Sequence, residues 1–111
     1  MGHHVRVCIE ACRETHRICM ETVTYLPGSH PRIAPDGIRL LFNCAEICRM
    51  SATLLRDGWP LNGRAGAICA EVCEESARYC DELGDDPRIQ ACADACRRCA
   101  ESCHQLAVLA A

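Results

Sequence analysis

Cysteine is the residue whose number and spacing in this chain most strongly indicate a chemistry, namely the binding of soft metal ions. The 111 residues include 12 cysteines, and steps of four, three and four residues account for all of them. All are candidate metal ligands: Cys8, Cys12, Cys19, Cys44, Cys48, Cys69, Cys73, Cys80, Cys92, Cys96, Cys99 and Cys103. The remaining positions of the same pattern carry Thr15, Ser51, Leu55 and Ser76.

This spacing places each run of cysteines on one face of a helix. An α-helix turns by about 100° per residue, so offsets of 0, 4, 7 and 11 residues fall within roughly 60° of one another. Residues four apart have Cβ atoms about 5–6 Å from each other, so two such thiolates could hold one small soft ion. A single pair is usually just two small core residues, whereas several in register favour a metal site. The pairs are Cys8/Cys12, Cys44/Cys48, Cys69/Cys73, Cys92/Cys96 and Cys99/Cys103.

Turn-forming residues separate the runs and predict one domain, residues 1–111, made of four helices. We expect these helices near residues 4–26, 36–57, 62–83 and 87–109. Two of the connections are so short that the helices they join must be antiparallel neighbours. The predicted fold is therefore all-α, an up-down-up-down four-helix bundle with a cysteine-lined core. Leucines that continue the same faces should close its ends: Leu26, Leu55, Leu83 and Leu106.

Capping residues mark the predicted helix ends. Asp36 is the expected N-cap of the second helix, and Asn62 that of the third. Gly58 suits a left-handed cap where the second helix ends before Trp59 and Pro60. For the fourth helix we expect Asp86 as N-cap and a proline at the first helical position.

Charge and composition exclude several classes of partner. The net charge is −3 and the charges are interspersed, which argues against nucleic acid as a partner. No apolar run approaches the roughly 20 residues that span a bilayer, so we expect no membrane association. The N-terminal residues show neither an apolar signal segment nor a twin arginine, which predicts a cytoplasmic protein with reduced thiols. His3 and His4 could instead be remnants of an expression tag, which would leave open a removed leader.

Electrostatics distinguishes the metals that thiolates can bind. A zinc ion or an iron–sulfur cluster held by four thiolates keeps net negative charge, and the thiol faces carry no lysine or arginine to balance it. Cu(I) ions that share bridging thiolates can approach one ion per sulfur, which leaves the core neutral. Cu(I) also accepts two or three ligands, whereas zinc favours four in a tetrahedron. We therefore expect several Cu(I) ions per chain; the alternatives are an iron–sulfur electron-transfer protein and a zinc buffer.

These features resemble the four-helix-bundle copper storage proteins, and in particular their cytosolic branch. The resemblance rests on the Cys-x-x-x-Cys pairs, on inward-facing cysteines in all four predicted helices and on the missing export signal. It implies a cytoplasmic store that binds many Cu(I) ions through core thiolates and protects against copper toxicity. It further implies a homotetramer, admission of copper at one end past His or Met residues, and copper chaperones or efflux machinery as partners.

Histidine and methionine side chains could also assist a copper site. His16 lies about 40° beyond Cys12 on the first helix, so it could ligate incoming Cu(I) or be a bundle-edge histidine with a solvent partner. Met20 and Met50 lie off the thiol faces, where packing is favoured over a thioether relay. His104 points about 100° away from the preceding cysteine, which favours a surface or interface position.

Two further motifs have ordinary explanations. A histidine at the third position could form a square-planar Cu(II) or Ni(II) site with the terminal amine, but a tag remnant or disorder is favoured. The Cys96–Cys99 spacing occurs in thiol oxidoreductases, but there it begins a helix beside a strand, whereas here it is mid-helix. We find no Ser/His/Asp arrangement, glycine-rich phosphate loop or inward carboxylate pair, and so expect no enzyme.

Overall fold

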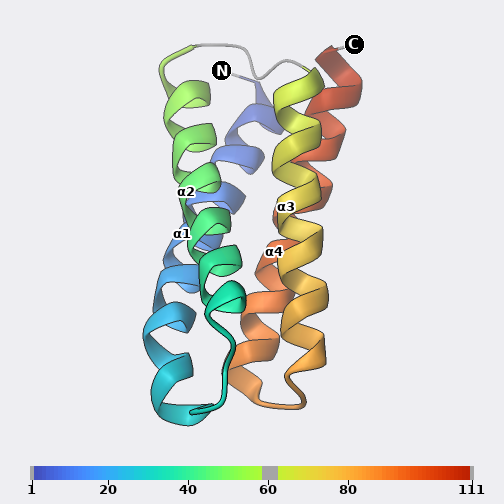
Figure 1. The fold of residues 1–111 in the computed structure, drawn as a ribbon. Helices are drawn as coiled ribbons and strands as arrows, with labels where there is room; N and C mark the ends of the chain where they lie inside the picture. The colour runs from blue at the N-terminus through green and yellow to red at the C-terminus, as the bar shows by residue number, and fades with distance from the viewer. Residues whose placement is uncertain (1, 59–62, 111) are drawn as a thin grey trace.

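Four antiparallel α-helices make up the computed structural model, which describes residues 2–58 and 63–110. The helices are α1 (His3–Ser29), α2 (Pro35–Arg56), α3 (Gly63–Glu82) and α4 (Pro87–Ala110). Both chain ends lie at one end of the bundle, and the α1–α2 and α3–α4 connections lie at the other (Figure 1). The chain is therefore an up-down-up-down four-helix bundle, which confirms the predicted fold class.

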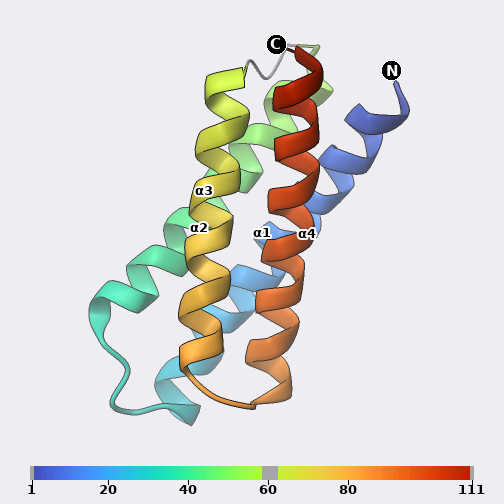
Figure 2. The same cartoon turned by 90° about the vertical axis from the view of Figure 1, so that its right-hand side faces the viewer.

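Each helix packs against two neighbours, so all four surround one long axis. α1 contacts α2 and α4, and α3 contacts the same two helices; among the described residues no close backbone contact joins α1 to α3 or α2 to α4. Figure 2 shows the α3–α4 pair in front of the α1–α2 pair, with the two pairs inclined to each other. The bundle measures 42 × 21 × 20 Å, so one face of every helix is directed into a narrow interior.

The first helix continues to Ser29, beyond the predicted end near residue 26, and includes Pro27. A proline lacks the N–H of the helical hydrogen-bond ladder, so Pro27, in the last turn, donates no helical bond to the carbonyl four residues earlier. Other groups complete this turn: the His30 N–H donates to the Leu26 carbonyl at 2.7 Å, and the Ser29 hydroxyl donates to the Tyr25 carbonyl at 3.1 Å. These bonds support the last turn of α1 on both sides of the proline.

The second helix begins at Pro35, so the prediction that Asp36 is its N-cap is wrong. Ala34 occupies the N-cap position and makes no side-chain capping bond. Proline is well suited to the first helical position, because its missing N–H would have no helical partner there. Asp36 instead lies in the first turn. Its carboxylate interacts favourably there with the positive end of the helix dipole, and it pairs with Arg39.

The C-terminal end of α2 agrees with the prediction as far as the structure describes it. Gly58 has a φ of +84°, the left-handed backbone that glycine adopts without steric cost. Its N–H donates to the Leu55 carbonyl at 3.2 Å, and the Asp57 N–H donates to Thr53 at 3.0 Å. The predicted roles of Trp59, Pro60 and Asn62 lie outside the described residues, as does Met1 of the possible N-terminal metal site.

Asp86 joins the start of α4 to the end of α1. One carboxylate oxygen accepts the Arg88 N–H at 2.9 Å, as expected of an N-cap, and Pro87 is the first helical residue. The other oxygen accepts the hydroxyl of Tyr25 at 2.5 Å, and the Arg88 guanidinium lies 4.9 Å above the tyrosine ring. Local sequence predicts the cap, but the contact with Tyr25 arises only because the bundle brings these helix ends together.

Small residues dominate the interior beside the cysteines, which lets the helices approach closely. The buried alanines are Ala45, Ala52, Ala70, Ala77, Ala93, Ala95 and Ala100. At the end formed by the α1–α2 and α3–α4 connections, Leu26, Leu41 and Ile89 are fully buried. Leu55 is buried toward the other end, and Leu83 and Leu106 pack against the core while half-buried. None of the described helices has the length and apolar character needed to cross a bilayer.

Candidate metal centre

All the cysteine side chains point into the bundle, and all are free thiols. Each has a relative exposure of 0%, which confirms that the thiol faces of the four helices converge on a shared core. The members are Cys8, Cys12, Cys19, Cys44, Cys48, Cys69, Cys73, Cys80, Cys92, Cys96, Cys99 and Cys103. Thiols therefore occupy interior positions that aliphatic side chains could fill equally well if burial of apolar surface were the only need.

The middle of the bundle holds two groups of four sulfurs that overlap. Cys12, Cys69, Cys99 and Cys103 form the first group, in which every sulfur lies within 4.8 Å of the others. Cys48 and Cys73 join Cys69 and Cys99 in the second group under the same limit. Because both groups contain Cys69 and Cys99, they cannot act as two independent four-ligand sites at the same time.

Sulfur contacts extend from these groups to both ends of the thiol core. On one side Cys8 lies 3.8 Å from Cys103, whose sulfur is also 3.3 Å from that of Cys69. On the other side Cys19, Cys44 and Cys96 form a third group with all sulfurs within 4.8 Å. The contact between Cys44 and Cys73, at 3.8 Å, links this group to the middle of the bundle. The sulfurs thus form a continuous path along the axis.

Most of the short sulfur–sulfur distances join different helices. Cys12 contacts Cys99 at 3.6 Å between α1 and α4, and Cys48 contacts both Cys73 and Cys99 at 3.7 Å. Among residues four apart on one helix, Cys99 and Cys103 approach to 4.0 Å. Facing thiol stripes interdigitate across the narrow interior, so the metal-binding unit that the geometry favours is a set of sulfurs from several helices.

Neighbouring thiols change one another's pKa in opposite directions. Hydrogen bonds from Cys103 and Cys12 lower the pKa of Cys8 to about 5. Hydrogen bonds from Cys103, Cys12 and Cys48 lower the pKa of Cys99 to about 2. The donors respond the other way: the pKa of Cys103 is raised, first by its hydrogen bond with Cys12. Adjacent buried thiolates repel, so a positive ion is needed before all of these groups can ionise together.

The hydroxyl residues of the pattern are buried among the thiols. The Thr15 hydroxyl donates to the carbonyl of Ala95 at 3.1 Å, which joins α1 to α4. Ser51 is 3% exposed and Ser76 is 0% exposed. Leu55, the apolar member of this set, is 6% exposed. These residues occupy the same inward stripe as the cysteines, as their spacing predicts.

A family model for copper storage proteins matches residues 1–108. The chain belongs to the copper storage protein family. A relative in Bacillus subtilis strain 168, the cysteine-rich protein YhjQ, is 33% identical over 108 residues, which is 96% of this chain and 99% of the relative. The similarity therefore spans the whole bundle, including all four cysteine runs.

Solved structures of similar proteins have the same fold. A protein from Nitrosospira multiformis has a TM-score of 0.87 and 31% identity, covering 98% of this chain and 99% of its own. Apo copper storage protein 3 from Bacillus subtilis has a TM-score of 0.78 and 33% identity, over 92% of this chain and 97% of its own. The Cu(I)-bound form of that copper storage protein has a TM-score of 0.80 and 30% identity, over 95% and 99%.

His16 lies outside the three sulfur groups of this family member. Its Nδ1 is 2.9 Å from the carbonyl oxygen of Ala45, so the imidazole joins α1 to α2. A carbonyl only accepts hydrogen bonds, so Nδ1 carries the proton and Nε2 of the neutral ring keeps its lone pair. The hydrogen-bond partner of His16 is thus a backbone carbonyl, whereas the sequence suggested solvent. Its Nε2 still has a lone pair with which it could bind a metal ion.

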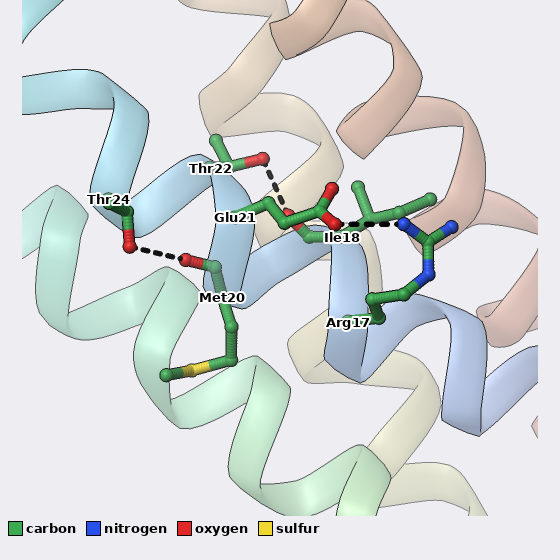
Figure 3. A network of polar contacts seen from close by, with 6 residues as sticks. All are labelled: Arg17, Ile18, Met20, Glu21, Thr22 and Thr24. Carbon is green, nitrogen blue, oxygen red and sulfur yellow. Dashed lines mark hydrogen bonds and ion pairs between the residues drawn. The ribbon is translucent and has the colours of Figure 1, made fainter.

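Met20 and Met50 lie off the thiol core. Met20 is half-buried, and its thioether extends on the α2 side of α1 (Figure 3), in agreement with a packing role. On the same helix the Thr24 hydroxyl donates to the Met20 carbonyl at 3.1 Å, and the Thr22 hydroxyl donates to the Ile18 carbonyl at 2.8 Å (Figure 3). Met50 is 57% exposed on α2. His104 is exposed as well, which agrees with the predicted surface position.

The Cys96–Cys99 motif lies in the middle of α4, and both of its sulfurs belong to core groups. The two residues between them are exposed arginines that pair with acids on neighbouring helices: Arg97 with Asp81, and Arg98 with Glu14 at 3.9 Å. The motif is therefore part of the thiol stripe. The sequence does not reveal which cysteines share two sulfur groups, because that depends on the helix offsets in the folded bundle.

Proposed function

We propose that this chain is a store and buffer for Cu(I) that binds several ions per molecule through its core thiolates. The observation that carries this function is the continuous path of fully buried, free thiols from all four helices. All the cysteines of the chain are the proposed ligands, and Nε2 of His16 is proposed as an accessory ligand. Stored copper would be kept from adventitious sites elsewhere, which protects against copper toxicity.

The overlap of the sulfur groups favours copper over the alternative metals. A structural zinc site or a four-iron cluster takes four protein ligands, and because the two middle groups share Cys69 and Cys99, they cannot supply four thiolates each to two such centres. Cu(I) binds two or three thiolates and accepts bridging ones, so shared sulfurs are an advantage. Bridged Cu(I) can also approach one ion per sulfur and cancel the thiolate charge in a core that contains no lysine or arginine.

Further parts of the proposal concern the setting of the protein. Reduced thiols suit the cytoplasm, and storage requires no catalytic step. Exposed apolar side chains on α2, namely Phe42 and Met50, supply surface for assembly into a homotetramer. Copper chaperones or efflux machinery would exchange copper with the store.

Anaerobic titration of the fully reduced chain with Cu(I), against a competing chelator, tests this function. We expect more than about four ions per chain, since bridging lets each thiolate serve more than one ion. Saturation below about four would contradict storage, because so few ions would leave most thiols unused. Competition with Zn(II) tests the zinc buffer. Anaerobic reconstitution with iron and sulfide tests the electron-transfer alternative, which a colourless product removes.

A further inference from the structure

Ser76 carries a buried hydroxyl that has no hydrogen-bond partner among the described residues. Its relative exposure is 0%, and neither an oxygen nor a sulfur lies in hydrogen-bonding geometry with its Oγ atom. The buried hydroxyls of Thr15 and Thr22 differ, because they donate to the carbonyls of Ala95 and Ile18. Leaving a buried hydroxyl unpaired is destabilising, so this group calls for an explanation.

The position of Ser76 indicates what its partner would be. The residue follows Cys73 by three positions and precedes Cys80 by four, so all three share the inward face of α3. Cys73 belongs to the second group of four sulfurs and contacts both Cys44 and Cys48. The hydroxyl is therefore set within the thiol stripe, beside sulfurs that become thiolates when metal binds.

Metal loading changes these sulfurs from poor acceptors into good ones. A neutral thiol is a weak hydrogen-bond acceptor, whereas a thiolate bears negative charge and attracts an O–H donor. Hydroxyl oxygen is a hard ligand that Cu(I) disfavours, so Ser76 suits the role of donor to a metal-bound sulfur better than that of a ligand. Such outer hydrogen bonds commonly strengthen metal sites.

We infer that Ser76 is a positioning residue whose hydroxyl donates to a copper-bound thiolate of α3, and so strengthens copper binding in the loaded state. This inference rests on the proposed function. The apo protein then retains an unsatisfied hydroxyl, and copper supplies its partner. Ser76 is thus suited to the loaded state at the expense of the empty one.

The test compares Ser76→Ala with Thr15→Val, because the Thr15 hydroxyl already has a partner without metal. Unfolding of the reduced apo chains is measured in urea, and Cu(I) affinity is measured with a competing chelator. We expect Ser76→Ala to leave apo stability unchanged or higher and to weaken copper affinity about tenfold, the lower range for loss of an outer hydrogen bond. Thr15→Val should lower apo stability and leave copper affinity unchanged.

Any other result for Ser76→Ala overturns the inference. Wild-type copper affinity in this variant, or equal weakening by both variants, would mean that the hydroxyl of Ser76 has no specific role in the loaded state. Lower apo stability would mean that the hydroxyl already has a partner without copper. If the wild-type chain binds no more than about four ions, the storage function and this inference are overturned together. If the wild-type chain stores copper but Ser76→Ala binds it with unchanged affinity, the inference alone is overturned.

Discussion

The side chain of Tyr79 on α3 lies directly against the backbone of Gly37 in the first turns of α2. A Cβ atom at position 37 would come within 1.9 Å of the tyrosine hydroxyl oxygen and 2.1 Å of its Cζ. Gly37 is buried and Tyr79 is half-buried, and burial is the first cause that raises the pKa of the phenol. Any larger residue at position 37 would therefore force the ring of Tyr79 out of its place against α2.

Gly37→Ala should destabilise the bundle by about 1–3 kcal/mol, the usual cost of overpacking a close contact. The measurement is urea unfolding of the reduced apo chain, followed by circular dichroism. Gly28→Ala is a matched control, because a Cβ at this helical position meets nothing within 4 Å. That control should be neutral or gain up to about 1 kcal/mol from helix propensity. Equal stability of the two variants would contradict the steric account.

The bond between Tyr25 and Asp86 should make stability depend on pH. The Tyr25 hydroxyl is the first cause that holds the pKa of Asp86 below its usual range. Because the pKa is lower in the folded state, the stabilisation is present above the unfolded pKa, near 4, and is lost as pH falls through the folded value. Tyr25→Phe should therefore be less stable than wild type at pH 7, and the difference should shrink at pH 3. A difference independent of pH would argue against this coupling.

Cys99 should matter more for copper binding than Cys80. Cys99 belongs to both groups of four sulfurs, whereas Cys80 belongs to none of the three groups. We expect Cys99→Ser to weaken Cu(I) affinity by more than about tenfold. Loss of a bridging ligand should reduce the affinity more than loss of a hydrogen bond to a ligand, which costs about tenfold or more. Cys80→Ser removes an equally buried thiol and is the control, with a smaller loss. Chelator competition measures both, and equal losses would contradict a shared role for Cys99.

A new thiol at position 15 should increase copper capacity. Thr15 is 1% exposed and lies on the thiol face of α1, so Thr15→Cys adds a sulfur to the core. Loss of the hydrogen bond to Ala95 should cost about 1 kcal/mol of apo stability. Thr24→Cys adds a thiol at an exposed position of the same helix and should leave the core capacity unchanged. The number of Cu(I) ions bound per chain is measured for both variants under reducing conditions. The same number in both would contradict the prediction.

Copper loading should release protons and weaken as pH falls. The pKa values of Cys48 and Cys96 are raised by thiol hydrogen bonds and burial, so these groups are protonated near neutral pH. Cu(I) must displace their protons to bind, which makes affinity pH-dependent. Proton release is measured in weak buffer during anaerobic titration. Affinity that is identical at pH 5.5 and pH 7.5 would contradict thiolate binding.

The sequence by itself determined the helical faces and the thiol core through the cysteine spacing, because helix periodicity converts spacing into orientation, and the four-helix bundle through the turn residues and short connections between the runs. The same local logic predicted the cap of α4 at Asp86 and the turn at Gly58, both of which the structure contains. The capping prediction failed at Asp36, because Pro35 takes the first helical position and places Asp36 inside the helix. Local sequence signals are strong where one turn of chain contains all the interacting groups.

Only the tertiary structure decided which sulfurs come together, because that depends on the offset of each helix along the axis. The shared positions of Cys69 and Cys99 follow from this offset, as does the contact of Gly37 with Tyr79. The same is true of Ser76: the pattern places it inward, but its missing partner is a property of the packed core. A stripe specifies which face is buried, and packing specifies what each buried atom touches.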